Sequence, residues 1–283
     1  MEITRLKNKI SSYNDGFFIY DHIKYSKAFS PSFAYDIHDV CEVLFLKAGN
    51  ITYTVEGRSY ETKKDTLIFT RPGDRHNLYF NDDSAYERHD ILFDTKILSP
   101  GVYEKIPRGI DVIDAADYPL IDEIFQKMDY YCKYFEGDDL KNILTHLTEE
   151  IIYNIILMDK VFSESVEATR YSANPTVTKA LGYIEKNISR NFSLDDLCNE
   201  LFITKSHLHR LFSENLEITP KKYINSKRLI LAQKLLRRGE KPAHIYQECG
   251  FSEYSTFWRE YKKYFGYSPS EENNQVITRK LDF

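Results

Sequence analysis

Hydrophobic and polar residues alternate between Tyr35 and Leu92, and turn residues interrupt this alternation repeatedly. The spacing predicts short β-strands, the clearest of which lie at 42–46, 51–55, 58–60 and 66–70. Glu56-Gly57 is a hairpin-turn signal between the second and third of these strands, and Pro72-Gly73 ends the fourth. Several short strands with such turns indicate an antiparallel sandwich or barrel.

The hydrophobic period changes to that of amphipathic helices further along the chain. One stripe runs from Leu120 to Met128 and a second from Leu140 to Ile155. Both have the spacing of a helix with one apolar face, so we predict two helices within 118–160. Strands followed by helices make this half of the chain α+β.

Residues 175–270 predict helices with well-marked ends. Ser193 is placed to cap a helix at 194–201, with Asp196 three residues on, and Thr204 is placed to cap a helix at 205–214. A helix, a short turn and a second helix form the unit that places its second helix in a DNA major groove.

The same unit recurs further along this half of the chain. We predict a short helix at 245–249, a turn at Gly250-Phe251 and a second helix at 253–265. Between the two units, Thr219 caps a long amphipathic helix at 220–238 that Gly239 ends. The C-terminal half is therefore predicted to be all-α, with two helix-turn-helix units joined by a long helix.

The charge of the chain divides in the same place as its periodicity. The 283 residues carry a net charge of −5, made up of −10 over residues 1–174, +6 over 175–270 and −1 over 271–283. A basic segment beside an acidic one is typical of a protein in which one domain meets nucleic acid. We assign a first domain at 1–162, a polar linker at 163–174, a second domain at 175–270 and a tail at 271–283.

Other sequence features exclude several classes of protein. The four cysteines lie far apart with no C-x-x-C pair, which argues against a zinc cluster and against a disulfide framework. The most apolar run, 151–158, is short and contains Tyr153 and Asn154, so no membrane span is expected. Because the N-terminus has no apolar signal core, we expect a cytoplasmic protein with no membrane partner.

The basic half contains an ordered set of motifs: Leu208-x-Arg210-Leu211-Phe212, Arg228-Leu229-x-x-Ala232, Cys249-Gly250-Phe251-Ser252 and Gly266-Tyr267-Ser268-Pro269. With these motifs it resembles the DNA-binding domain of the AraC family of bacterial transcription regulators. Phe202 and Glu217 stand where the family usually has glycine, and Tyr246 stands where alanine is usual. A cupin-like domain before these units is the family's common arrangement, so the resemblance covers nearly the whole chain.

This resemblance implies double-stranded DNA as a partner and assigns residues to the contact. Ser206, His209, Tyr254, Ser255 and Trp258 are expected at base edges, whereas Arg210 and Arg259 either support phosphate contact or brace their own units. Trp258 has two interpretations: contact with thymine methyl groups, or packing against Tyr254 and Lys262 of its own helix. The full set of expected DNA-binding residues is Lys205, Ser206, His209, Arg210, Tyr254, Ser255, Trp258, Arg259 and Lys262.

The strand region is similar to the two-part signature of the cupin barrel, in which histidines and a glutamate converge on a metal. His38 and Glu42 form the first part, and the run from Pro72 to His76 closes the second. Asp36 stands where the first histidine of the metal pattern belongs, so we expect neither a metal nor another cofactor. Alternatively, Asp36 completes a nitrogen and oxygen site for iron, manganese or zinc. In the metal-free interpretation, Glu42 pairs with Arg71 or Arg75.

A barrel mouth also accommodates small ligands, whose orientation is fixed by a few polar groups. The candidate lining comprises His38, Glu42, Tyr53, Arg71 and His76. We therefore predict a non-enzymatic, sequence-specific transcription regulator that responds to a small-molecule effector, for which family habit suggests a carbohydrate.

The remaining partners follow from the family resemblance. The helices at 118–160 are expected to form a homodimer surface, although one of the two alternatively packs on the barrel. RNA polymerase is a further expected partner. Two rival functions stay open: a metal-dependent cupin enzyme with a nucleic-acid-binding tail, and an effector-independent regulator whose barrel only dimerises.

Overall fold

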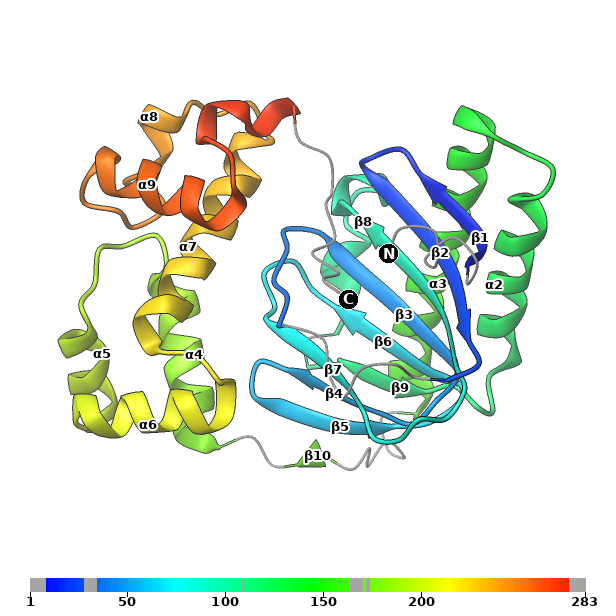
Figure 1. The fold of residues 1–283 in the computed structure, drawn as a ribbon, viewed down its shortest axis with the longest axis horizontal. Coiled ribbons are helices and arrows are strands. Elements are labelled where there is room, and N and C mark those ends of the chain that lie inside the picture. The colour runs from blue at the N-terminus through cyan, green and yellow to red at the C-terminus, as the bar shows by residue number, and fades with distance from the viewer. Residues whose placement is uncertain (1–8, 28–34, 108, 163–169, 172–173, 275–283) are drawn as a thin grey trace.

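The computed structural model describes residues 9–27, 35–107, 109–162, 170–171 and 174–274. A β-rich N-terminal domain and a helical C-terminal domain lie side by side (Figure 1). This arrangement confirms the predicted α+β fold class. The strands of the first domain are β1 Lys9–Asn14, β2 Phe18–Tyr25, β3 Cys41–Ala48, β4 Ile51–Val55, β5 Arg58–Thr62, β6 Thr66–Thr70, β7 His76–Phe80, β8 Tyr86–Phe93, β9 Val112–Asp114 and β10 Arg170–Tyr171.

The strands form two antiparallel sheets that face each other. One sheet has the order β1-β2-β8-β3-β6-β9 and the other β10-β5-β4-β7. The strands predicted at 51–55 and 66–70 coincide with β4 and β6, and those predicted at 42–46 and 58–60 lie inside β3 and β5. β1 and β2 precede Tyr35, where the predicted alternation begins, and they correspond to no predicted strand.

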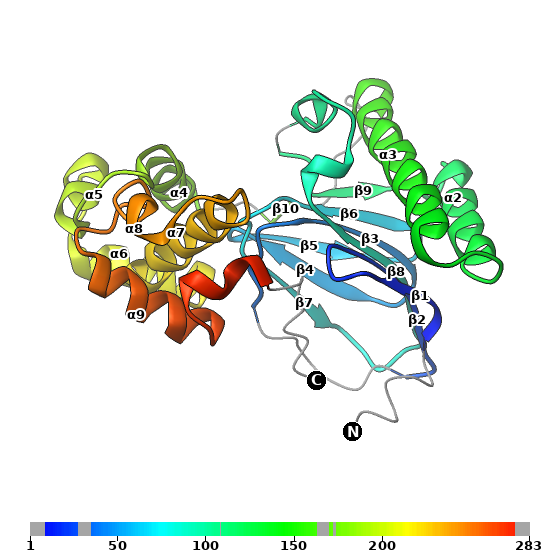
Figure 2. The same cartoon turned by 90° about the horizontal axis from the view of Figure 1, so that it is seen from above.

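Alternation along β3 divides the domain into an inner and an outer hydrophobic layer. Leu44 and Leu46 belong to the cluster between the sheets, whereas Val43 and Phe45 belong to the cluster under the helices. Two helices, α2 Pro119–Tyr131 and α3 Gly137–Phe162, lie along the six-stranded sheet and cover its outer face (Figure 2). The Phe45 ring stacks on Phe125 of α2 at 5.2 Å between centroids.

The hydrophobic stripes of α2 and α3 therefore pack on the barrel. Ile121, Ile124 and Phe125 of α2 and Leu144 and Ile151 of α3 are at most 1% exposed and belong to the cluster shared with the sheet. The sequence left this alternative open for one of the two helices, whereas in the structure most of the stripe of both helices packs on the sheet. Two short 3-10 helices, η1 Thr95–Ile97 and η2 Tyr103–Lys105, lie between β8 and β9. None of the helices in the described ranges is long and apolar enough to cross a membrane.

The predicted linker lies mostly outside the described residues, which omit 163–169 and 172–173. Its described part, Arg170–Tyr171, forms β10 and pairs with Tyr60 and Ser59 of β5. The chain therefore contributes an edge strand to the smaller sheet before it enters the second domain.

The second domain consists of helices with the caps that the sequence predicted. Ser193 and Asp196 form a reciprocal capping box, and Thr204 accepts a hydrogen bond from the backbone of His207. The helices are α4 Pro175–Asn187, α5 Leu194–Leu201, α6 Lys205–Leu216, α7 Pro220–Leu236, α8 Pro242–Ile245 and α9 Tyr254–Phe265, followed by the 3-10 helix η3 Pro269–Asn274.

The helices predicted at 205–214, 220–238 and 253–265 differ from α6, α7 and α9 by one or two residues at one end, and two other parts of the prediction differ by more. The short helix expected at 245–249 lies instead at Pro242–Ile245, because proline with its fixed φ favours the first helical turn. The boundary drawn at 270 falls inside η3, where the Glu272 side chain is 1% exposed and accepts hydrogen bonds from Tyr261 and Arg237. The packed domain therefore extends beyond the predicted boundary and includes η3.

The two residues that replace family glycines adopt the left-handed conformation. Phe202 has φ 54° and Glu217 has φ 51°, at the C-terminal ends of α5 and α6. A side chain at such a position costs about 1 kcal/mol relative to glycine. The second domain therefore accepts this backbone strain at both Phe202 and Glu217.

We expect Gly250→Ala to destabilise the second domain much more than Gly239→Ala. Both glycines have positive φ, 76° and 89°, so both substitutions cost about 1–2 kcal/mol in backbone strain. A Cβ at Gly250 would also lie 2.6 Å from Arg228 Nε and 2.7 Å from the Ile188 carbonyl oxygen, whereas one at Gly239 meets nothing within 4 Å. Urea unfolding should show Gly250→Ala about 1–3 kcal/mol less stable than Gly239→Ala. Equal destabilisation would contradict this packing.

Candidate functional site

Three predicted residues of the barrel meet in one buried group, which we call the inner cluster: His38, Glu42 and His76. The Glu42 Oε2 atom lies 3.1 Å from His76 Nε2 and 3.5 Å from His38 Nε2. Glu42 projects from β3 on the same side as Leu44, so the cluster lies on the inner face of the larger sheet. Glu42 and His76 are 7% and 8% exposed.

Backbone carbonyls orient both imidazoles toward Glu42. His38 Nδ1 donates to the Val40 carbonyl and His76 Nδ1 to the Asp74 carbonyl, both at 2.9 Å, so each Nε2 atom points to the carboxylate. Burial opposes a charge on His76, but the hydrogen bond and the negative charge of Glu42 outweigh it and raise the pKa of His76 to about 9. Glu42 thus pairs with histidines, which corrects the expectation that it pairs with Arg71 or Arg75.

The structure brings Tyr53 close to the inner cluster but not Arg71. The Tyr53 hydroxyl lies 2.6 Å from Thr70 Oγ1, and its ring centroid is 6.2 Å from that of His76. Arg71 donates to the carbonyls of Pro107 and Ile110 and contacts Asp111 at 3.4 Å. Arg71 therefore holds the segment around Pro107, Ile110 and Asp111 rather than the inner cluster.

Two charged residues inside the barrel, Arg88 and Asp90, were not among the residues predicted from the sequence. They pair with Leu46 and Leu44 across the β3–β8 ladder and so share the inner face. Arg88 is 4% exposed, its Nη2 lies 3.5 Å from Asp90 Oδ2, and its Nε has no hydrogen-bond partner. The alternation of Tyr86, Arg88 and Asp90 along one strand was the signal that would have revealed them.

Two groups in the described residues have donors close enough for a metal ion. Asp36, His38 and His76 form the first, at the inner cluster, and His22, His89 and Asp129 form the second, under α2. In the second group, His22 Nδ1 lies 2.7 Å from Asp129, and the two imidazoles stack at 3.8 Å. Burial, reinforced by His22, lowers the pKa of His89 to about 3.

The nine expected DNA-binding residues all lie on α6 or α9. Eight are exposed and Trp258 is half-buried. The buried residues of these helices, among them Leu208, Phe212 and Phe257, face the domain core, so the polar set faces outward. Lys205 Nζ contacts Asp195 at 2.8 Å, and this exposed pair leaves the lysine accessible to a phosphate.

Trp258 combines features of both interpretations drawn from the sequence. The Nζ atom of Lys262 lies 5.2 Å from its ring centroid, as expected for packing within its own helix. Tyr254 packs instead against Tyr246 and Phe257, at 5.9 and 6.1 Å between centroids. Part of the indole therefore stays open to a partner.

A pocket of about 380 Å³ lies between the two domains. Its walls come from the barrel, from the start of α7 and from α9. It is lined by Tyr35, Ile37, Arg75, Ile218, Lys222, Asn225, Ser226, Glu260, Lys263 and Tyr264.

The pairing of His76 with Glu42 makes the stability of the protein pH-dependent. Because the folded-state pKa of about 9 exceeds the ordinary value of 6.5, the stabilisation is complete below pH 6.5 and is lost as the pH rises through 9. We expect the free energy of unfolding to fall less steeply between these pH values in His76→Asn than in the unsubstituted protein. Denaturant titrations at several pH values measure this slope, with exposed His209→Ala as the control. Identical slopes in His76→Asn and the unsubstituted protein would refute the pairing.

Each of the two domains matches a model of a known protein family. Residues 28–100 match the model of the AraC-like ligand binding domain, and residues 197–275 match a helix-turn-helix domain model. The HTH-type transcriptional activator RhaS of Escherichia coli is 23% identical over 244 residues, covering 83% of this chain and 85% of RhaS.

Solved structures with related chains include ToxT of Vibrio cholerae bound to an unsaturated fatty acid, with 16% identity, coverage of 95% of this chain and 99% of that one, and a TM-score of 0.40. An AraC-type regulator from Chromobacterium violaceum is 33% identical, with coverage of 35% of this chain and 90% of that one and a TM-score of 0.33. The ligand-binding match, the helix-turn-helix match and the likeness to RhaS along most of its length together show that this chain belongs to the AraC family of DNA-binding transcription regulators.

Proposed function

We propose that this regulator binds its effector inside the barrel, between the inner cluster and Arg88. The observation that carries the proposal concerns two buried nitrogen atoms that make no hydrogen bond: His38 Nε2, which lies 3.5 Å from Glu42 Oε2, and Arg88 Nε. A buried polar atom left unpaired costs about 1–3 kcal/mol, so a ligand that pairs with both atoms recovers this energy. The cations Lys222 and Lys263 of the interdomain pocket are exposed to solvent, and water satisfies them without a ligand.

The charges inside the barrel favour a neutral ligand with several hydroxyl groups. Arg88 and protonated His76 are balanced by Glu42 and Asp90, so a strongly charged effector would leave one group uncompensated. Hydroxyl groups donate to carboxylates and accept from guanidinium and imidazole nitrogens. We therefore propose a carbohydrate or a similar polyol.

The family supports a regulatory rather than a catalytic role for this barrel. The matched relative RhaS is by name a transcriptional activator, and we propose activation, with RNA polymerase as a partner, for this chain in the cytoplasm. A metal at the inner cluster would favour the rival cupin enzyme. An effector-independent barrel would leave His38 and Arg88 without a role.

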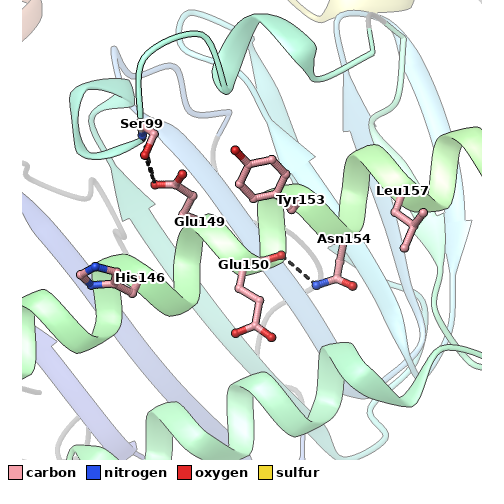
Figure 3. A pocket seen from close by; sticks show the side chains of 7 residues that line it. All are labelled: Ser99, His146, Glu149, Glu150, Tyr153, Asn154 and Leu157. Atoms are coloured by element: carbon pink, nitrogen blue, oxygen red, sulfur yellow. Dashed lines mark hydrogen bonds between the residues drawn. The ribbon is translucent and has the colours of Figure 1, made fainter.

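We also propose a homodimer formed through the exposed side of α3. Tyr153 and Leu157 lie one turn apart and are 46% and 45% exposed, although most apolar residues of this helix are buried. They line a surface pocket of about 440 Å³, where Glu149 accepts hydrogen bonds from the backbone and side chain of Ser99 (Figure 3). Exposed apolar residues rimmed by polar ones are typical of a subunit contact.

Thermal denaturation of the full chain with a panel of neutral monosaccharides and matched sugar acids tests the effector proposal. We expect one neutral sugar to raise the melting temperature by several degrees, since saturation at 100 times Kd contributes about 2.7 kcal/mol. The increase should disappear in His38→Gln and in Arg88→Gln, and remain in Lys222→Gln, which alters the interdomain pocket. An increase that survives both barrel substitutions, or that depends on Lys222, would place the effector elsewhere.

The repeated unit predicts two separate contacts with DNA. The 17 residues of α7 span about 25 Å, which allows α6 and α9 to enter major grooves roughly one helical turn apart on one face of the duplex. We call the base pairs that face one helix-turn-helix unit a patch. On a duplex selected from a random pool, His209→Ala and Trp258→Ala should each relax the sequence preference in one patch only, by about 1–3 kcal/mol.

Substitution of residues that contact phosphate is expected to affect DNA binding differently from substitution of residues that contact bases. Lys221→Ala and Lys262→Ala should weaken binding to all sequences and reduce the salt slope by about one unit each. Fluorescence anisotropy at several salt concentrations, with each patch scrambled in turn, separates the two classes. If scrambling one patch leaves the affinity unchanged, the unit facing it only supports the fold.

A further inference from the structure

One loop of the barrel, residues 71–76, contacts both the inner cluster and the DNA-binding domain. Its last residue, His76, belongs to the inner cluster, and its Gly73 amide donates to the His38 carbonyl at 2.7 Å. The His76 ring is held by the Asp74 carbonyl, and reciprocal backbone hydrogen bonds of 2.9 and 3.0 Å join His76 to Asp36. A change at the inner cluster therefore acts directly on this loop.

The other side of the loop meets the end of the first recognition helix. Arg75 Nη1 donates to the carbonyl of Leu216, the last residue of α6. The guanidinium carbon lies 3.4 Å from the ring centroid of Tyr35, and Arg75 is only 7% exposed. A cation at the C-terminal carbonyls of a helix is favourable because the helix dipole is negative there.

A buried carboxylate fixes the loop to α7 as well. Glu56, in the turn between β4 and β5, exchanges hydrogen bonds with the backbone of Arg75, at 2.9 Å in each direction. The same carboxylate accepts from Tyr223 and from Lys227, both at 2.6 Å, and Lys227 also donates to the Gly73 carbonyl at 2.5 Å. The loop, the hairpin turn and both helices are thus linked through a few charged hydrogen bonds.

We propose that Arg75 is a positioning residue that couples the inner cluster to the orientation of α6. The proposal rests on the effector site proposed above, because it assigns the route by which occupancy of that site reaches DNA. A ligand that engages His76 or Glu42 changes the interaction that holds the loop, and the loop in turn holds Leu216 through Arg75. Coupling of this kind requires that the ligand favours one arrangement of the loop over another.

Hydrogen exchange of the full chain tests the coupling without an effector. Glu42→Gln removes the ion pair with His76, so the amides of residues 213–218 should exchange severalfold faster than in the unsubstituted protein. Arg75→Gln should accelerate the same amides, and Glu42→Gln added to it should have no further effect. Arg71→Gln is the matched control, because Arg71 occupies the same loop but bonds to residues 107–111 of its own domain. In the Arg71→Gln variant, adding Glu42→Gln should still accelerate amide exchange of residues 213–218.

Exchange in α2 and α3 serves as the reference for an intact fold in every variant. If the effects of Glu42→Gln and Arg75→Gln add, Arg75 is only a structural contact and the proposal fails. It also fails if Glu42→Gln leaves residues 213–218 unchanged, or if Arg71→Gln abolishes the response. Because no effector is used, a negative sugar screen would overturn the effector proposal but not this one.

Discussion

The arrangement of the two domains depends on the burial of the Glu56 carboxylate between them. It accepts hydrogen bonds from Tyr223 and Lys227 of α7 and from the backbone of Arg75, and it is 8% exposed. A buried charge is tolerated only when its partners are all present, and removal of one partner of such a pair costs about 3–5 kcal/mol. Glu56 also has a φ of 47°, which favours glycine or asparagine, so the turn accepts backbone strain in order to present this carboxylate.

The charged groups inside the barrel are less completely hydrogen-bonded than the Glu56 carboxylate at the domain interface. At the interface the Glu56 carboxylate accepts three hydrogen bonds, whereas inside the barrel His38 Nε2 and Arg88 Nε make none. A structural core has no reason to retain such groups, because apolar residues of similar size would be more stable there. This difference supports the proposal that the effector binds inside the barrel rather than at the domain interface.

The long helix α7 connects these two regions to both DNA-binding units. In its first half, Tyr223 and Lys227 donate hydrogen bonds to Glu56. Directly after its last residue, Arg237 contacts Asp39 of the barrel and Glu272 of η3, at 2.8 Å each. Asp39 is the neighbour of His38, so a second contact joins the surroundings of the inner cluster to the second unit. The contacts at its two ends therefore hold α7 against the barrel domain.

The sequence by itself determined the local structure, because caps, turns and hydrophobic period act over a few residues. Ser193, Thr204 and Thr219 cap the helices that they were predicted to cap, and the strands at 51–55 and 66–70 coincide with β4 and β6. The motifs of the second domain also identified the family. Only the tertiary structure decided which charged groups meet. It separated Arg71 from His38 and Glu42, revealed Arg88 and Asp90 on the inner face of β8, and joined Arg75 to Leu216. Arg71 and Arg75 lie far along the chain from the groups that they contact, and these contacts depend on how loops and domains pack, which no local pattern encodes. Arg88 and Asp90 alternate on one face of β8, and only the pairing of β8 with β3 shows that this face is the inner one.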